Sequence, residues 1–196
     1  MEQDDLSARL DQRRNRFETS AWLLLLVGLF ALIWGGKEWT GNVSSVDRLV
    51  AAGLAVTLLA LSAFDLDQYR LPDWITGPLI LSGLLVTYVR NGDLTASILG
   101  AMTGYLLIFL IARYWRFRYN RNGIGMGDAK LLAGLGAWLG LYNLPVVLLV
   151  ASSSALILIA LRQIVIRTKF SKNIVPFGPF LCLAGWLLWV FPIYSV

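Results

Sequence analysis

Long stretches of apolar residues dominate this sequence and restrict the chain to a helical membrane fold. Six of them approach the ~20 residues that an α-helix needs to cross the hydrocarbon core of a bilayer. They are Ala21–Trp34, Leu49–Phe64, Ile75–Val89, Ile98–Tyr114, Leu144–Leu161 and Val175–Val190. A seventh stretch, Ala129–Leu141, is shorter. Only 15% of the 196 residues are charged, against ~25% in soluble domains. We therefore predict an all-α polytopic transmembrane bundle of about seven spans.

Positive charges gather at alternate ends of these stretches and predict the topology. The clusters precede Ala21–Trp34 and follow Ile98–Tyr114 and Leu144–Leu161; they are Arg9, Arg13, Arg14, Arg16, Arg113, Arg116, Arg118, Arg121, Arg162, Arg167, Lys169 and Lys172. The expected external loops carry only Lys37, Arg48 and Arg90. Because Lys and Arg are enriched in cytoplasmic loops, we expect a cytoplasmic N-terminus and an external C-terminus. The net charge of +5 is thus interpreted as a topology signal, and no nucleic-acid partner is expected.

The chain is expected to have three parts. Residues 1–20 form a cytoplasmic tail, residues 21–47 hold the first span and an external loop, and residues 48–196 form the membrane domain that carries the chemistry. Polar residues precede the first apolar stretch and no small-residue cleavage site follows it. We therefore expect the first span to be retained and not removed as a signal peptide.

Histidine is absent and Cys182 is the single cysteine. Ser-His and Cys-His catalysis are therefore excluded, together with an intrachain disulfide and a cysteine zinc cluster. We expect neither a metal nor a cofactor. Carboxylates are the remaining acid–base groups.

Two aspartates are candidates for the functional site. Asp65 ends one apolar stretch, and Asp128 follows Gly125-Met126-Gly127 at the head of the short one. A carboxylate at membrane depth is costly and marks a functional site by default. The two glycines leave the backbone free to adopt positive φ and to approach a substrate closely. The competing interpretation is that Asp128 merely caps a helix that starts near Ala129.

Two carboxyls held together can share one proton, so that the neutral one polarises a carbonyl while the anion takes a proton from water. Asp65 lies at the C-terminus of its predicted helix and Asp128 at the N-terminus of another, with Lys130 nearby. Helix dipoles then favour Asp65 as the acid and Asp128 as the base.

The remaining candidates support this pair. Pro72 stops a helix, Asp73 with Thr76 is typical of a helix cap, and Asp67 is expected to be a solvated residue of a cytoplasmic turn over Asp65–Trp74. The supporting set is Gly125, Gly127, Lys130, Asp67, Pro72 and Asp73. Glycines spaced one helical turn apart, Gly100 with Gly104 and Gly136 with Gly140, predict close helix packing.

Three stretches resemble the signatures of bacterial type IV prepilin peptidases. Residues 65–76 read Asp-Leu-Asp-Gln-Tyr-Arg-Leu-Pro-Asp-Trp-Ile-Thr, and residues 125–140 open with the Gly-Met-Gly-Asp motif that this family shares with presenilin-type intramembrane proteases. Residues 176–180, Pro-Phe-Gly-Pro-Phe, resemble a third recurrent stretch. The resemblance covers Leu54–Trp189 and keeps the family's order.

The resemblance implies a multi-pass aspartyl endopeptidase of the bacterial inner membrane, with Asp65 and Asp128 as the catalytic pair. It implies that the partners are prepilins of type IV pili or pseudopilins of type II secretion, cleaved on the cytoplasmic side of the lipid bilayer. Residues 48–196 would then be the aspartyl peptidase membrane domain. Longer family members also carry paired Cys-x-x-Cys motifs and methylate the product. This sequence has no such motif, so a peptidase-only form is expected.

Two other classes of protein remain open. A proton- or cation-coupled transporter also places carboxylates in broken membrane helices. A non-catalytic assembly subunit of a pilus or secretion machine would keep the fold without the chemistry.

Overall fold

A computed structural model describes residues 45–68, 71–119, 125–166, 176–191 and 193. In these ranges the chain is helical and holds no strand, which confirms the predicted all-α class for this part. The helices are α2 (Ser45–Gln68), α3 (Asp73–Val89), α4 (Leu94–Tyr119), α5 (Met126–Leu139), α6 (Leu144–Ile166) and α7 (Gly178–Val190), with the 3-10 turn η1 (Leu141–Asn143) before α6. The predicted tail and the first apolar stretch, Ala21–Trp34, lie outside the described residues.

Three of the described helices are long and apolar enough to cross a membrane. The qualifying segments are Ser45–Asp67, Leu94–Tyr119 and Leu141–Leu161, of 23, 26 and 21 residues. At ~1.5 Å per residue each exceeds the ~30 Å of a hydrocarbon core. Helices α3 and α7 are apolar but shorter, and α5 has 14 residues. The seven spans and the cytoplasmic N-terminus stay predictions.

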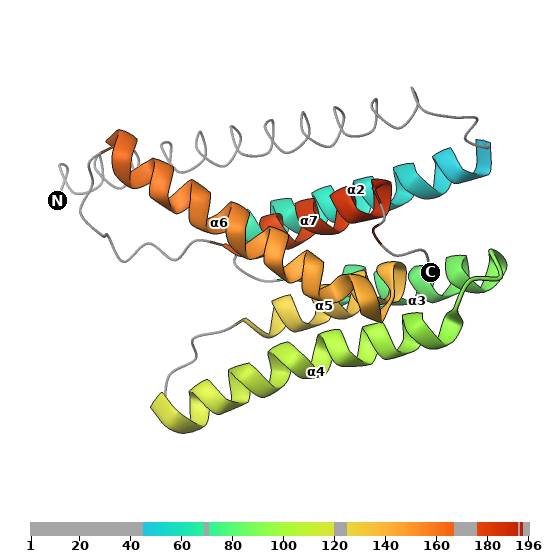
Figure 1. The fold of residues 1–196 in the computed structure, drawn as a ribbon, viewed down its shortest axis with the longest axis horizontal. Coiled ribbons are helices and arrows are strands. Elements are labelled where there is room, and N and C mark those ends of the chain that lie inside the picture. Colours follow the sequence, from blue (N-terminus) through green and yellow to red (C-terminus); the bar gives the residue numbers. More distant parts are fainter. Residues whose placement is uncertain (1–44, 69–70, 120–124, 167–175, 192, 194–196) are drawn as a thin grey trace, which may run out of the picture.

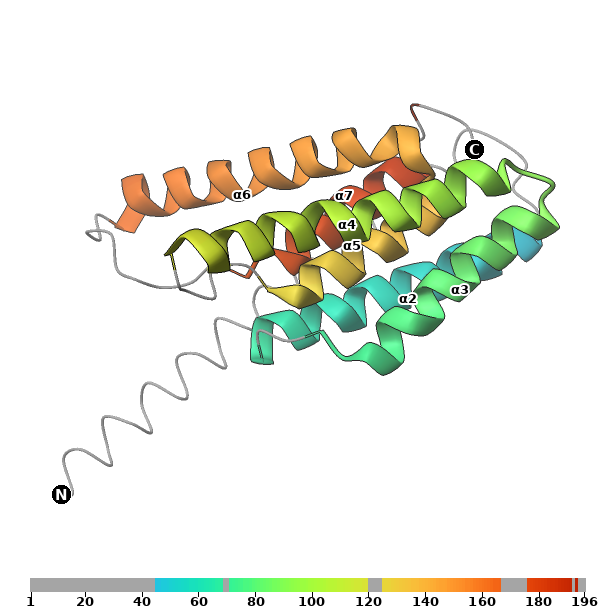
Figure 2. The same cartoon turned by 90° about the horizontal axis from the view of Figure 1, so that it is seen from below.

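Helix α5 occupies the centre of the described bundle. It packs against α3, α4, α6 and α7, while α2 packs along α7 (Figures 1 and 2). Because neighbours surround it, α5 is buried on nearly every face between Ala129 and Leu139. A short helix that is apolar all round fits such a position, because neighbouring helices cover every face.

Glycines bring α4 and α5 into direct backbone contact. A Cβ atom added to Gly100 would lie 2.5 Å from the carbonyl oxygen of Gly136, and one added to Gly104 would lie 2.7 Å from that of Leu132. The reverse is also true, because a Cβ atom on Gly136 would meet the backbone of Gly100. The predicted role in helix packing is confirmed for Gly100, Gly104 and Gly136, whereas Gly140 ends α5 with a positive φ of 73°.

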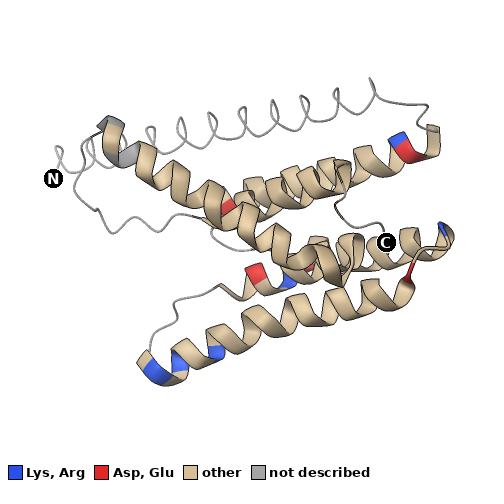
Figure 3. Ribbon diagram, viewed as in Figure 1, with Lys and Arg blue, Asp and Glu red and all other residues tan. Residues whose placement is uncertain are grey.

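The C-terminal ends of α2 and α4 and the N-terminal ends of α3, α5 and α7 lie at one end of the bundle (Figure 1). The last turns of α4 mark this end with basic residues (Figure 3). The short loops therefore bring residues from three separate stretches of sequence together, and this end carries the candidate site.

Candidate active site

Asp65 lies inside α2, one turn before the helix ends at Gln68. The predicted turn over Asp65–Trp74 is therefore wrong in its extent, because α2 continues past Asp65 and α3 already begins at Asp73. Only 5% of the Asp65 surface is exposed. Its Oδ2 atom accepts a hydrogen bond of 2.9 Å from the backbone N–H of Gly178, at the start of α7. A buried carboxyl thus has a specific partner on a neighbouring helix.

Asp128 is the third residue of α5, which begins at Met126 and not near Ala129. Gly125 holds the N-cap position and no side chain forms a cap hydrogen bond there. The alternative that Asp128 merely caps its helix is therefore wrong. The carboxyl is partly buried in the first turn of the helix, and a Cβ atom on Gly125 would lie 3.7 Å from its Oδ2 atom.

The two carboxyls lie near enough for the charge of Asp65 to act on Asp128. Asp65 comes from the C-terminal end of α2 and Asp128 from the N-terminal end of α5, so the pair exists only in the folded bundle. Cys182 of α7 forms a side-chain hydrogen bond with Ser62 of α2 and lies in the same region as both carboxyls. Ser62 and Cys182 are fully buried, so this side of the carboxyl pair is packed with protein.

Gly127 allows the start of α5 to lie close to Leu71, and it does not adopt a positive φ. A Cβ atom on Gly127 would lie 2.7 Å from Leu71 Cδ1 and 3.1 Å from Leu71 Cβ, just before α3. Gly125 has φ −70° and ψ 130°, which any residue adopts. Among the described glycines only Gly140 has positive φ, at 73°. The expectation that Gly125 and Gly127 use positive φ is thus wrong.

Lys130 and Asp73 form an ion pair that joins α5 to the start of α3. The Lys130 ammonium is engaged there, which removes the predicted reason for it to favour the anion at Asp128. Asp73 is not the helix cap that we predicted, because Pro72 holds the N-cap position of α3. Asp67 is exposed in the last turn of α2. Gly127, Lys130, Pro72 and Asp73 therefore shape the connection beside the pair, and Asp67 remains in solvent contact.

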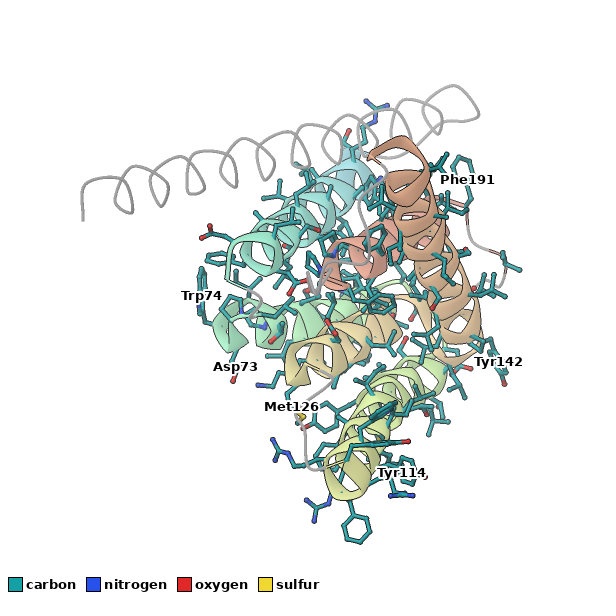
Figure 4. All side chains as sticks on the ribbon, turned by 90° about the vertical axis from the view of Figure 1, so that its left-hand side faces the viewer. Asp73, Trp74, Tyr114, Met126, Tyr142 and Phe191 are labelled. Atoms are coloured by element: carbon teal, nitrogen blue, oxygen red, sulfur yellow. The ribbon has the colours of Figure 1, made fainter. Side chains whose placement is uncertain are left out.

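Figure 4 looks onto this end of the bundle, where Asp73 and Trp74 of α3 lie to one side of Met126 at the start of α5. Trp74 packs edge-on against Phe64 with ring centroids 6.1 Å apart, which links α3 to the turn of α2 that carries Asp65. The rim of the site is thus built from α2, α3 and α5.

Sequence reasoning missed three residues of the site: Ser62, Gly178 and Cys182. The signal was present in helical spacing. Ser62 precedes Asp65 by three positions, and Cys182 follows Gly178 by four, so each pair shares one helix face. The sequence motif places Gly178 only within the Pro-Phe-Gly-Pro-Phe stretch. Within the described residues no group of three or more His, Cys, Asp or Glu side chains could hold a metal ion.

The fold and the site together define a helical membrane protein with an interacting pair of aspartates at one end of its bundle. Two such carboxyls can perform general acid–base chemistry on a substrate that reaches them. The model of the type IV leader peptidase family matches residues 52–160. The chain therefore belongs to the type IV leader peptidase family.

Relatives with curated descriptions agree with the family match. The chain is 44% identical over 149 residues to a prepilin leader peptidase/N-methyltransferase of Aeromonas salmonicida, covering 72% of this chain and 49% of the relative. It is 40% identical over 157 residues to the protein so named in Pseudomonas putida, covering 78% and 54%. The chain thus spans about half the length of these relatives. No solved structure matches it.

Proposed function

We propose that this protein is a membrane-embedded aspartic endopeptidase that cleaves the leader peptide from type IV prepilins or type II secretion pseudopilins. One observation carries the proposal: in a member of the leader peptidase family, Asp65 and Asp128 from separate helices are close enough for their charges to interact. The relatives are named for prepilin leader cleavage, which supports the choice of substrate.

The proposed mechanism uses the pair as a unit that shares one proton. The neutral carboxyl donates a hydrogen bond to the scissile carbonyl, and the anionic one takes a proton from the attacking water. Water then adds to the carbonyl carbon, and the amine of the new pilin N-terminus leaves with a proton returned by the pair. We retain Asp65 as the acid and Asp128 as the base, because Asp65 lies near a helix C-terminus and Asp128 in a first turn. The hydrogen bond that Asp65 accepts from Gly178 acts in the opposite direction, because a backbone donor favours the anion.

We propose that cleavage takes place on the cytoplasmic side of the bacterial inner membrane. The site shares one end of the bundle with the basic last turns of α4, where Arg116 and Arg118 lie (Figure 3). Lys and Arg are enriched on the cytoplasmic side of membrane proteins, which supports this orientation. A prepilin joins a positive leader to a hydrophobic helix, so the substrate would reach the pair from the lipid.

We propose peptidase activity without methyl transfer for the residues of this chain. The matched relatives are named for both activities, but Cys182 is the single cysteine of this sequence and no Cys-x-x-Cys motif occurs in it. The product is therefore expected to carry an unmethylated N-terminus when this chain acts alone.

The test is co-expression with a prepilin that carries its leader, followed by mass spectrometry of the pilin N-terminus. Wild-type protein should remove the leader, and Asp65→Asn and Asp128→Asn should each abolish removal. Asp67→Asn is the matched control, because Asp67 is an exposed aspartate two positions after Asp65; it should cleave normally.

An intact leader with several well-expressed prepilins would overturn the proposal. Loss of ion flux in the two site variants without any proteolytic change would favour a coupled transporter. Normal pilus assembly by both site variants would favour a non-catalytic assembly subunit.

A further inference from the structure

The start of α7 has a backbone donor for which Asp65 is the acceptor among the described residues. The first four N–H groups of a helix have no partner within that helix. In α7 the second residue is Pro179, which has no N–H. The next two N–H groups donate to the carbonyl oxygen of Phe177 at 3.1 and 3.2 Å. The remaining donor is the N–H of Gly178, which Asp65 Oδ2 accepts at 2.9 Å.

The contact leaves no room for a side chain at Gly178. A Cβ atom there would lie 2.5 Å from Asp65 Oδ2, 2.8 Å from Cγ and 3.1 Å from Cβ. These are the atoms of the carboxyl itself and of its attachment to α2, so moving one atom would not relieve the overlap. Gly178 therefore limits the positions of the Asp65 carboxyl both by a hydrogen bond and by direct contact.

We propose that Gly178 is a positioning residue that holds Asp65 Oδ2 and leaves Oδ1 as the oxygen that exchanges a proton. The catalytic part of this inference rests on the proposed function. When Asp65 is neutral, Oδ2 is the carbonyl oxygen and the proton is on Oδ1. That proton passes to the carbonyl oxygen of the substrate as the water oxygen bonds to the carbonyl carbon, and the proton lost by the water goes to Asp128.

The hydrogen bond has a test that does not need cleavage. Asp65→Asn keeps a side-chain oxygen that can accept the Gly178 N–H, whereas Asp65→Ala leaves that buried donor without a partner, which is costly. We expect the melting temperature in detergent to stay near the wild-type value for Asp65→Asn. It should fall on the order of 5 °C for Asp65→Ala.

The same two substitutions at Asp128 are the control, because Asp128 does not accept the Gly178 N–H. The melting temperatures of Asp128→Ala and Asp128→Asn should differ by no more than about 2 °C. This is less than the difference expected between Asp65→Ala and Asp65→Asn. Equal melting temperatures for Asp65→Ala and Asp65→Asn would overturn the inference.

The positioning role is tested by kinetics on a purified prepilin. Gly178→Ala should lower kcat on the order of 10²-fold and leave KM within about twofold, because a shifted catalytic carboxyl slows the chemistry and not the binding. Gly185→Ala is the matched control on α7, since its Cβ atom would press on the side chain of Leu135 and not on Asp65. It should keep kcat within about threefold even where its melting temperature falls.

The outcomes separate this inference from the proposed function. If the Asp65 variants differ in stability as expected but wild-type protein cleaves no prepilin, the proposed function fails and the hydrogen bond is supported. If wild-type protein cleaves but Gly178→Ala keeps the wild-type kcat, the positioning role fails alone. Equal loss of kcat in Gly178→Ala and Gly185→Ala would also overturn it, because the effect would then be one of general packing.

Discussion

Lys130 of α5 and Asp73 of α3 form an ion pair directly beside the first turn that carries Asp128. The ion pair links the start of α5 to the start of α3. The same two segments also meet where Gly127 packs against Leu71. Two contacts of different kinds, one ionic and one of close packing, therefore position the start of α5 against the start of α3.

The ion pair should contribute little to stability. The Asp73 side chain is 75% exposed and that of Lys130 is 32% exposed, and solvent-exposed pairs typically contribute ~0–1 kcal/mol. A double-mutant cycle with Asp73→Asn and Lys130→Met should give a coupling energy below ~1 kcal/mol that shrinks further at high salt. Chemical unfolding in detergent measures it. A salt-independent coupling above ~2 kcal/mol would show that the pair is shielded from solvent.

The two glycines of the Gly-Met-Gly-Asp motif should respond differently to alanine. Gly127→Ala should reduce cleavage at least tenfold, because its Cβ atom would overlap Leu71 and displace the turn that holds Asp128. Gly125→Ala should stay within about threefold of wild type, since its backbone is ordinary and, among the described residues, a Cβ atom there meets only Asp128 Oδ2, at 3.7 Å. Initial rates on a prepilin measure both.

The double variant Gly127→Ala/Leu71→Ala provides the control for that steric explanation. Removing the Leu71 side chain beyond Cβ takes away the atom nearest to the added methyl group, so part of the lost rate should return. A double variant no better than Gly127→Ala would contradict the explanation.

Gly136→Ala should destabilise the bundle by about 2–3 kcal/mol, because the added methyl group would meet the backbone of Gly100 and force α4 and α5 apart. Gly53→Ala on α2 is the matched control. No atom of the described residues lies within 4 Å of a Cβ atom there, so alanine should be neutral or stabilise by up to ~1 kcal/mol through its helix propensity. Unfolding titrations compare the two variants; equal stability would show that the helices can separate without cost.

Cys182 should be unreactive toward a maleimide until the bundle opens, since it is fully buried and is the single cysteine of the chain. Labelling should therefore follow the unfolding curve of the protein and give a clean measure of opening. Rapid labelling under native conditions would show that the region around α7 opens locally. If labelling of Cys182 does not increase when denaturant is added, α7 remains folded at those denaturant concentrations.

Much of the secondary structure could be predicted from hydrophobic content alone. The stretch Ile75–Val89 corresponds to α3 and Leu144–Leu161 to the greater part of α6, because a bilayer requires every backbone group to be paired within the helix. Helix ends were less predictable. Asp65 remains inside α2, and α5 starts three residues early at Met126, since these ends are decided by packing between neighbours.

The sequence by itself determined the helical membrane class, the absence of histidine chemistry and the candidacy of Asp65 and Asp128. Those properties depend on composition and on local motifs. Only the tertiary structure decided that the charges of Asp65 and Asp128 interact, that Lys130 pairs with Asp73, and that Gly178 donates to Asp65. Each of these contacts joins different helices, and their relative positions follow from how closely glycines allow the helices to pack.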